Sequence, residues 1–138
     1  MIRNVSYNNK EIFGEIDKLV GRSFGIKKRI KLGGTGSQRF VIRDSSSNID
    51  ELLALDTNLN YCNIELRSAG IIIRFRSILE TFAWAVPYEN LILNRKMGAL
   101  TFSDGETYLE IEPAHNATLN ISFFQKLNNL RSKDFKSN

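Results

Sequence analysis

The chain has 138 residues, of which 42% are hydrophobic and 25% charged, and only two are prolines. A chain of this length and composition can bury one core without disulfides or metals, and disordered or low-complexity architectures are excluded, so we expect one domain over residues 1–138. One cysteine and one histidine exclude an internal disulfide and a His-rich metal site. The net charge of +4 is weak evidence for a polyanionic partner, because many domains carry as much for solubility alone.

No run of apolar residues in the sequence predicts a membrane span or an export signal. The longest apolar runs are far shorter than the ~20 residues that a membrane span requires, and the first residues lack the apolar stretch of a signal peptide. We therefore expect a cytoplasmic protein.

The first half of the chain predicts a helix and then a hairpin. Apolar residues at the spacing of one helix face predict an amphipathic helix at 9–21, with an asparagine to cap it. Apolar residues then alternate with basic ones at 26–32 and again at 38–43, around the Gly-rich loop 33–37, which predicts two paired strands. Ile49, Leu52 and Leu53 suit one short helical turn.

Strand patterns are stronger from residue 61 onward. Alternating apolar residues predict strands at 61–68, 71–76 and 81–86, with a tight turn at Ala69-Gly70, and a further strand starting at 91. Asp104-Gly105 favours a two-residue turn, so we expect Phe102 to face Thr107 and Leu100 to face Leu109 in a hairpin over 99–111.

The chain is expected to end in a helix at 120–132. Ser122 and Gln125 have the spacing of a capping box, an apolar stripe follows, and residues 134–138 are expected to fray. The predicted fold class is therefore α+β: a bent antiparallel sheet or partly open barrel of about seven strands within 24–113, with an N-terminal and a C-terminal helix.

Candidate catalytic groups are sparse. Cys62 and His115 would form a nucleophilic pair only if the fold brought them together, and a semi-buried strand cysteine is the more frequent outcome. Glu110 and Glu112 project from one face of a strand about 7 Å apart, a spacing that acid–base pairs use, but Glu106 and Tyr108 share that face, so a solvated outer face is the more frequent outcome. We expect no catalytic set, no metal and no cofactor.

Basic residues gather around the Gly-rich loop 33–37. The loop lacks the lysine and the following helix of a P-loop, and it opens a strand where a dinucleotide fingerprint would open a helix. Its backbone N–H groups and the neighbouring cations could still hold an anion, although a flexible loop on a solvated basic hairpin is the more frequent outcome. The candidate anion-binding residues are Lys27, Lys28, Arg29, Lys31, Arg39 and Arg43.

A second basic group, Arg67, Arg74 and Arg76, is expected on the outer faces of two adjacent strands, where pairing with Glu65 would neutralise part of it. Proteins that read single-stranded nucleic acid interleave aromatic with basic residues on one exposed face, whereas the phenylalanines of these strands are expected in the core. The candidate partner-binding residues are Trp84, Arg74 and Arg76.

The run IELRSAGIIIRFRSILETFAWAVPYENLIL at 64–93 leads from strands into Val-Pro-Tyr-Glu-Asn-Leu. It resembles bacterial pleckstrin-homology-like (PH-like) domains, where a strand leads into an I/V-P-Y/W-x-x-I/L segment, and it is similar to small proteins of Bacteroidetes-type bacteria to which no activity is attached. The resemblance covers residues 61–131 and implies a bent sheet of about seven strands closed by a C-terminal helix, used for binding and not for catalysis. Phosphoinositide-binding members carry a basic pattern on the first hairpin, which this chain breaks at Val41.

Three functional hypotheses follow. The leading one is a non-catalytic interaction module that binds a protein or a membrane-associated partner. The alternative is a basic anion- or nucleic-acid-binding protein that uses the hairpin at 26–43, and the weakest is an enzyme that uses Glu110 and Glu112 or Cys62. A protein, an anionic surface and a second copy of the chain in a homodimer all remain open as partners.

Overall fold

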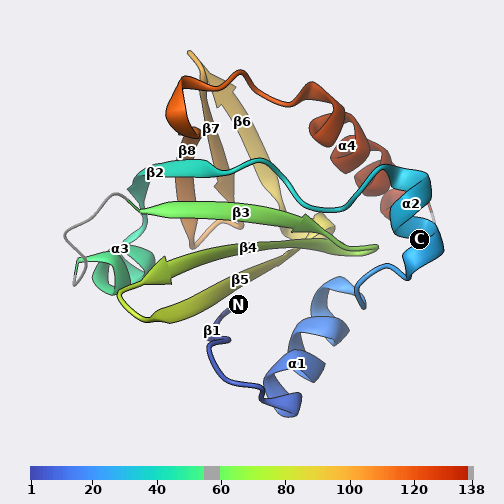
Figure 1. Cartoon of the computed structure of the whole chain (residues 1–138), viewed down its shortest axis with the longest axis horizontal. Coiled ribbons are helices and arrows are strands. Elements are labelled where there is room, and N and C mark those ends of the chain that lie inside the picture. The colour runs from blue at the N-terminus through green and yellow to red at the C-terminus, as the bar shows by residue number, and fades with distance from the viewer. Residues whose placement is uncertain (55–59, 137–138) are drawn as a thin grey trace.

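The computed structural model describes residues 1–54 and 60–136, with side chains as far as residue 133. Within these residues the chain forms one open, antiparallel, eight-stranded sheet in the order β1-β5-β4-β3-β2-β8-β7-β6 (Figure 1). The strands are β1 (Ile2–Asn4), β2 (Phe40–Ser45), β3 (Tyr61–Leu66), β4 (Gly70–Ser77), β5 (Glu80–Pro87), β6 (Ile92–Lys96), β7 (Ala99–Ser103) and β8 (Tyr108–Pro113). The helices are α1 (Lys10–Val20), α2 (Ile26–Leu32), α3 (Ser47–Leu53) and α4 (Ile121–Lys136), with short 3-10 turns η1 (Tyr88–Asn90) and η2 (Ala114–Asn116).

The predicted α+β class and the open antiparallel sheet are confirmed, with eight strands where about seven were expected. Strand β1, which pairs with β5 in the register Ile2↔Trp84, was not predicted. Consecutive strands β2 to β5 pair in series, as do β6 to β8, and the pairing of β2 with β8 joins the two groups.

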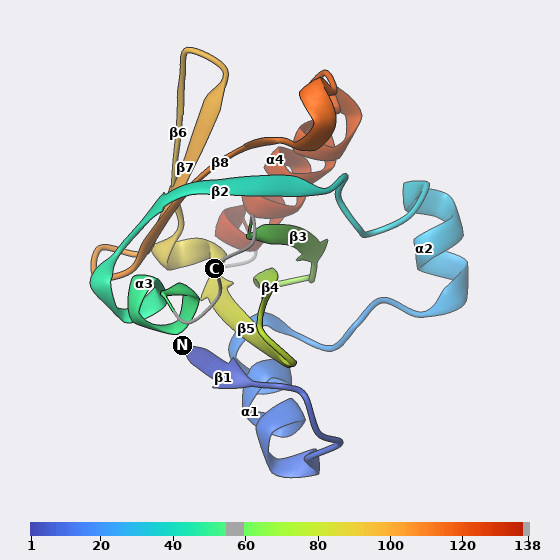
Figure 2. The ribbon, with the colours of Figure 1, turned by 60° about the vertical axis from the view of Figure 1, so that its left-hand side comes forward.

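Helices cover both faces of the central strands. The larger core cluster packs side chains of the sheet against α3 and α4, including Phe123 and Leu127. On the opposite face, Ile16 and Val20 of α1 pack against Ile72 and the small residues of β5 (Figure 2). Strand β4 is therefore buried and apolar on both faces over Ile71, Ile72 and Ile73, where helices cover both of them.

The helix predicted at 9–21 is confirmed as α1. The side chain of Asn9 accepts hydrogen bonds from the backbone N–H groups of Glu11 (3.0 Å) and Ile12 (3.3 Å), which satisfies two of the free donors at the start of the helix. The short helical turn expected near Ile49 is also confirmed, as α3.

The predicted hairpin at 26–43 is wrong in its first strand. Residues 26–32 form α2, and Gly33 ends that helix in a left-handed conformation with φ 74°. The N–H groups of Gly33 and Gly34 donate to the carbonyl oxygens of Ile30 and Arg29, a Schellman ending that needs a residue without a Cβ at positive φ. The glycines thus end a helix and do not turn a hairpin, whereas the second strand is present as β2.

The Asp104-Gly105 hairpin forms in a different register. Phe102 pairs with Leu109, and Leu100 pairs with Ile111, so the loop contains four residues instead of two. The Asp104 carboxylate accepts hydrogen bonds from the N–H groups of Glu106 (3.0 Å) and Thr107 (2.8 Å), and this side-chain turn replaces the expected tight one. The observed pairing is shifted by two residues from the predicted one. Such a shift keeps each side chain on its face of the sheet, so the predicted set of buried residues is unchanged.

The C-terminal helix is longer than predicted and begins with a different cap. Asn120, and not Ser122, accepts a hydrogen bond from the N–H of Phe123 (3.4 Å). Helix α4 continues to Lys136, which includes part of the segment expected to fray, and residues 137–138 lie outside the described part.

Candidate functional site

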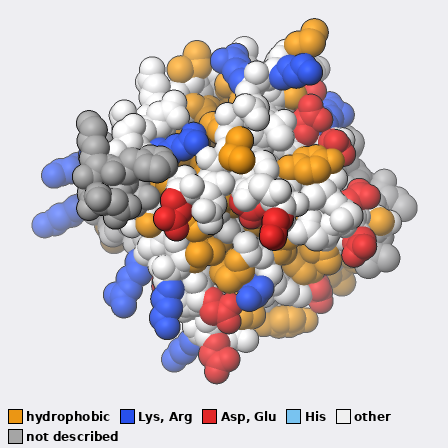
Figure 3. Space-filling model, turned by 180° about the vertical axis from the view of Figure 1, so that it is seen from behind, with side chains coloured by type: hydrophobic (Ala, Val, Ile, Leu, Met, Phe, Trp, Pro, Cys, Tyr) orange, Lys and Arg blue, Asp and Glu red, His pale blue; other side chains and the backbone are white. Residues whose placement is uncertain are grey.

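The positive charge of the chain is concentrated in one segment. Residues 18–43 contain eight Lys and Arg and no Asp or Glu, whereas the other residues contain eleven Lys and Arg against fifteen Asp and Glu. The remainder is therefore acidic by four charges, and this one segment carries more than the whole positive excess. Figure 3 shows Lys and Arg side chains along the edge of the molecule where α1 and α2 lie.

Helix α2 lies in this segment and exposes both its charged and its apolar residues. Its four cations, Lys27, Lys28, Arg29 and Lys31, are all exposed, and every residue of the helix is at least partly accessible. Ile26 and Ile30 are 70% and 75% exposed. Residues four apart lie on the same side of a helix, so the two isoleucines form one apolar face with cations on both flanks.

Contacts after its C-terminal end hold α2 in place. After the Schellman ending, the Lys126 ammonium of α4 donates to the carbonyl oxygens of Gly33 (3.2 Å) and Gly34 (3.5 Å). The following residues pair with β3 through hydrogen bonds from Leu66 N–H to the Thr35 carbonyl and from Ser37 N–H to the Ile64 carbonyl, both 2.8 Å. The helix thus stands at one side of the sheet with its outer face open (Figure 2).

The other two candidate anion-binding residues lie elsewhere. The Arg39 guanidinium lies over the Tyr61 ring, 5.1 Å from its centre, and that ring stacks on His115. Arg43 on β2 forms an ion pair with Glu112 (3.1 Å). The structure therefore brings four of the six predicted residues together on α2, whereas Arg39 contacts Tyr61 and Arg43 is paired with Glu112.

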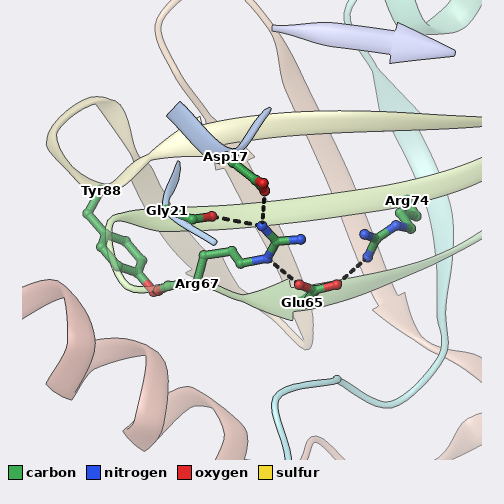
Figure 4. Close-up of polar contacts among 6 residues, drawn as sticks. All are labelled: Asp17, Gly21, Glu65, Arg67, Arg74 and Tyr88. Atoms are coloured by element: carbon green, nitrogen blue, oxygen red, sulfur yellow. Dashed lines mark hydrogen bonds and ion pairs between the residues drawn. The ribbon is translucent and has the colours of Figure 1, made fainter. Parts of the chain in front are cut away.

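The second basic group is largely neutralised by carboxylates (Figure 4). Arg67 is buried and donates to Glu65, to Asp17 (3.0 Å) and to the carbonyl of Gly21 (2.7 Å). Arg74 donates to the other oxygen of Glu65 (2.7 Å), which confirms the expected pairing of this group with Glu65. Burial raises the pKa of Glu65, but the hydrogen bonds from the two arginines outweigh it and leave that pKa below its ordinary value.

This network joins α1 to the sheet. Asp17 belongs to α1 and Gly21 follows it, while Glu65 and Arg74 lie on β3 and β4. The Tyr88 hydroxyl donates to the backbone carbonyl of Arg67 (2.7 Å), so the backbone of Arg67 is held as well as its side chain. A pocket of about 420 Å³ lies beside it, lined by Val5, Ser6, Phe13, Ile16, Asp17, Arg67, Arg74 and Thr81. Its two arginines are paired with Asp17, which also lines the pocket, and with Glu65 beside it, so the formal charges of the network cancel.

Of the candidate partner-binding residues, Trp84 is wrongly assigned. Its side chain is fully buried in the main core cluster because β1 and β4 flank it and helices cover the sheet. Arg74 is engaged with Glu65, and Arg76 is exposed on β4. The exposed apolar residues Ile26 and Ile30 were assigned to a buried strand face in the sequence, because a spacing of four fits one face of a strand or of a helix. The glycine that follows the segment, Gly33, is the signal that favours a helix.

The candidate catalytic groups are not brought together. Cys62 is 3% exposed in the core, whereas His115 is exposed and stacks on Tyr61, which precedes Cys62 on β3 and points to the opposite face. Glu112 pairs with Arg43, and Glu110 lies opposite Thr101 and Asp44 in the sheet.

Cys62 is expected to resist thiol reagents while the protein is folded. Burial raises the pKa of this thiol to about 12, so the reactive thiolate is scarce at neutral pH. Mass spectrometry after treatment with iodoacetamide should show labelling only when denaturant is present. Rapid labelling of the folded protein would contradict the burial and restore Cys62 as a candidate nucleophile.

Among the described residues, no three His, Cys, Asp or Glu side chains cluster in a way that could hold a metal ion. The helices of residues 1–54 and 60–136 are all too short or too polar to cross a membrane. Comparison of the chain with protein-family models, curated proteins and solved structures found no match.

Proposed function

We propose that this protein is a non-catalytic binding module that attaches to a negatively charged partner through α2. The observation that carries the proposal is the exposed helix at the centre of a 26-residue segment, 18–43, that contains eight cations and no carboxylate. Cations without local counter-charges set up a positive potential that attracts an anionic surface and accelerates its association.

The arrangement of the strands supports the idea of a PH-like module. Strands β2 to β5 and β6 to β8 form two meanders joined through β2 and β8, and a C-terminal helix follows. This corresponds to the bent sheet with a C-terminal helix that the resemblance implies, with β1, α1 and α2 as additions before it. A fold alone does not define a function, so the proposal depends on α2 and not on this likeness.

The first test removes the charges of α2. Changing Lys27, Lys28, Arg29 and Lys31 to Gln is expected to lower the salt concentration that elutes the protein from a heparin column to roughly half or below, because fewer counterions are released on binding. Glutamine favours helices about as well as lysine and arginine, so α2 should persist.

The matched control removes four exposed cations from other elements: Lys10, Arg76, Arg95 and Lys96, again changed to Gln. This variant has the same net charge as the α2 variant but should elute at a clearly higher salt concentration. Equal elution of both variants would mean that only net charge matters, and elution of the α2 variant with the wild type would contradict the proposal.

A further inference from the structure

We infer that the negatively charged partner is an anionic lipid bilayer, and that α2 lies in its interface with Ile26 and Ile30 inserted. This inference rests on the proposed function and adds the class of partner. The charge of α2 accounts for attraction to any polyanion, so the choice among partners depends on its apolar residues.

Two isoleucines on one helix face are left in water. Ile26 and Ile30 are 70% and 75% exposed, although each could remove most of its apolar surface from water in a suitable environment. An amphipathic helix that lies in the plane of a membrane interface buries such a face among the upper acyl chains. The bilayer thus gives these side chains the apolar surroundings that the rest of this chain does not.

The cations stand where lipid phosphates would meet them. Lys27 and Lys31 flank the isoleucine face on one side of the helix, and Arg29 flanks it on the other, as the 3.6-residue period requires. Their long aliphatic stems can lie along the apolar boundary while the charged heads reach the headgroups. Each Lys or Arg near an anionic leaflet strengthens binding roughly fivefold.

The shape of this surface favours a membrane over a peptide or a nucleic acid. The hollow beside the helix, lined by Ile26, Arg29, Ile30, Gly33 and Gly34, is wide and shallow and offers a peptide no groove. Residues 26–32 contain no aromatic side chain on which a nucleobase could stack. The open outer face of α2, at one side of the molecule, can instead meet a flat surface (Figures 1 and 2).

The test is co-sedimentation with vesicles of phosphatidylcholine alone or of phosphatidylcholine with an equal amount of phosphatidylglycerol. The wild type should bind the mixed vesicles and not the neutral ones. Changing Ile26 and Ile30 together to Ser should weaken binding to the mixed vesicles at least about tenfold, because the inserted apolar surface is lost. Retention of this variant on heparin should stay at the wild-type level, because its cations are intact.

The control changes Ile92 and Met97, which are 49% and 96% exposed on the β6–β7 hairpin, to Ser. This variant loses comparable apolar surface and should sediment with the mixed vesicles like the wild type. If the Ile26/Ile30 variant also sediments like the wild type, or if the wild type binds heparin but not the mixed vesicles, the bilayer inference is overturned and the proposed function stands. If the wild type does not bind heparin at all, the proposed function itself is overturned.

Discussion

Replacing Arg67 with methionine is expected to lower the free energy of unfolding by about 3–5 kcal/mol, the range for a buried ion pair that loses one partner. Methionine fills much of the space of the arginine stem but donates no hydrogen bond. The variant leaves the Glu65 carboxylate, the Asp17 carboxylate and the Gly21 carbonyl without the donor that each has in the wild type. Urea unfolding followed by circular dichroism measures the loss.

Arg74→Met is the matched comparison, because Arg74 binds the same Glu65 but its side chain is 35% exposed, against 9% for Arg67. Water can replace this interaction in part, so we expect a loss of about 1 kcal/mol or less. Equal losses in the two variants would contradict the special role of the buried guanidinium.

The pH dependence gives a second check on Arg67. Because the pKa of Glu65 is lowered in the folded protein, its interaction with the arginines stabilises the fold above the pKa of the unfolded state and is lost as the pH falls through the folded value. The difference in stability between the wild type and Arg67→Met should therefore narrow in acid. If the difference in stability between the two proteins stays constant as the pH is lowered, the stability lost in Arg67→Met comes from packing and not from charge.

The same network also positions the proposed binding helix. Arg67 holds Asp17 near the end of α1 and the carbonyl of Gly21, and residues 22–25 connect Gly21 to α2. At the other end of α2, Lys126 and the pairing of residues 35–37 with β3 complete the attachment. A helix with no buried residue of its own is thus held by the segments before and after it, and the first of these also packs Phe24 against the main core.

Strands β3, β4, β5, β7 and β8 were predictable because their apolar residues alternate over about five positions between clear turn residues. Strand β6 has only two adjacent apolar residues before three polar ones, so only its start was predicted. Long alternating runs exclude a helix, since a helical period would scatter the same residues around its axis. The asparagine before α1 and the five apolar residues of that helix gave an equally consistent pattern. In these segments the local preference and the tertiary environment agree.

The segment 26–32 was not predictable from its period, because seven residues with isoleucines four apart fit both a strand and a helix. The helix depends on Gly33, whose positive φ ends it, and on Lys126, which binds the end of the helix from almost a hundred residues away in the chain. The three-residue strand β1 is too short to show a period at all; it depends on the free edge of β5.

The misassignment of Trp84 has a different cause. Alternation correctly placed Phe82, Trp84 and Val86 on one face of a strand, but a pattern within one strand does not say what covers that face. Here α3, α4 and their neighbours do so, and the side chain that was expected to meet a partner lies within the core. Replacing Trp84 is therefore expected to lower the stability of the fold and to leave binding through α2 unchanged.

Trp84→Ala is accordingly expected to lower the free energy of unfolding by about 3–5 kcal/mol, because a large cavity replaces a fully buried indole. Thermal unfolding measures the loss, and Met97→Ala, at a residue 96% exposed, should leave the midpoint unchanged. Below its midpoint the Trp84 variant should still elute from heparin with the wild type, since α2 is intact. A variant that keeps its stability but loses its binding would instead place Trp84 at the partner interface, against the burial seen in the structure.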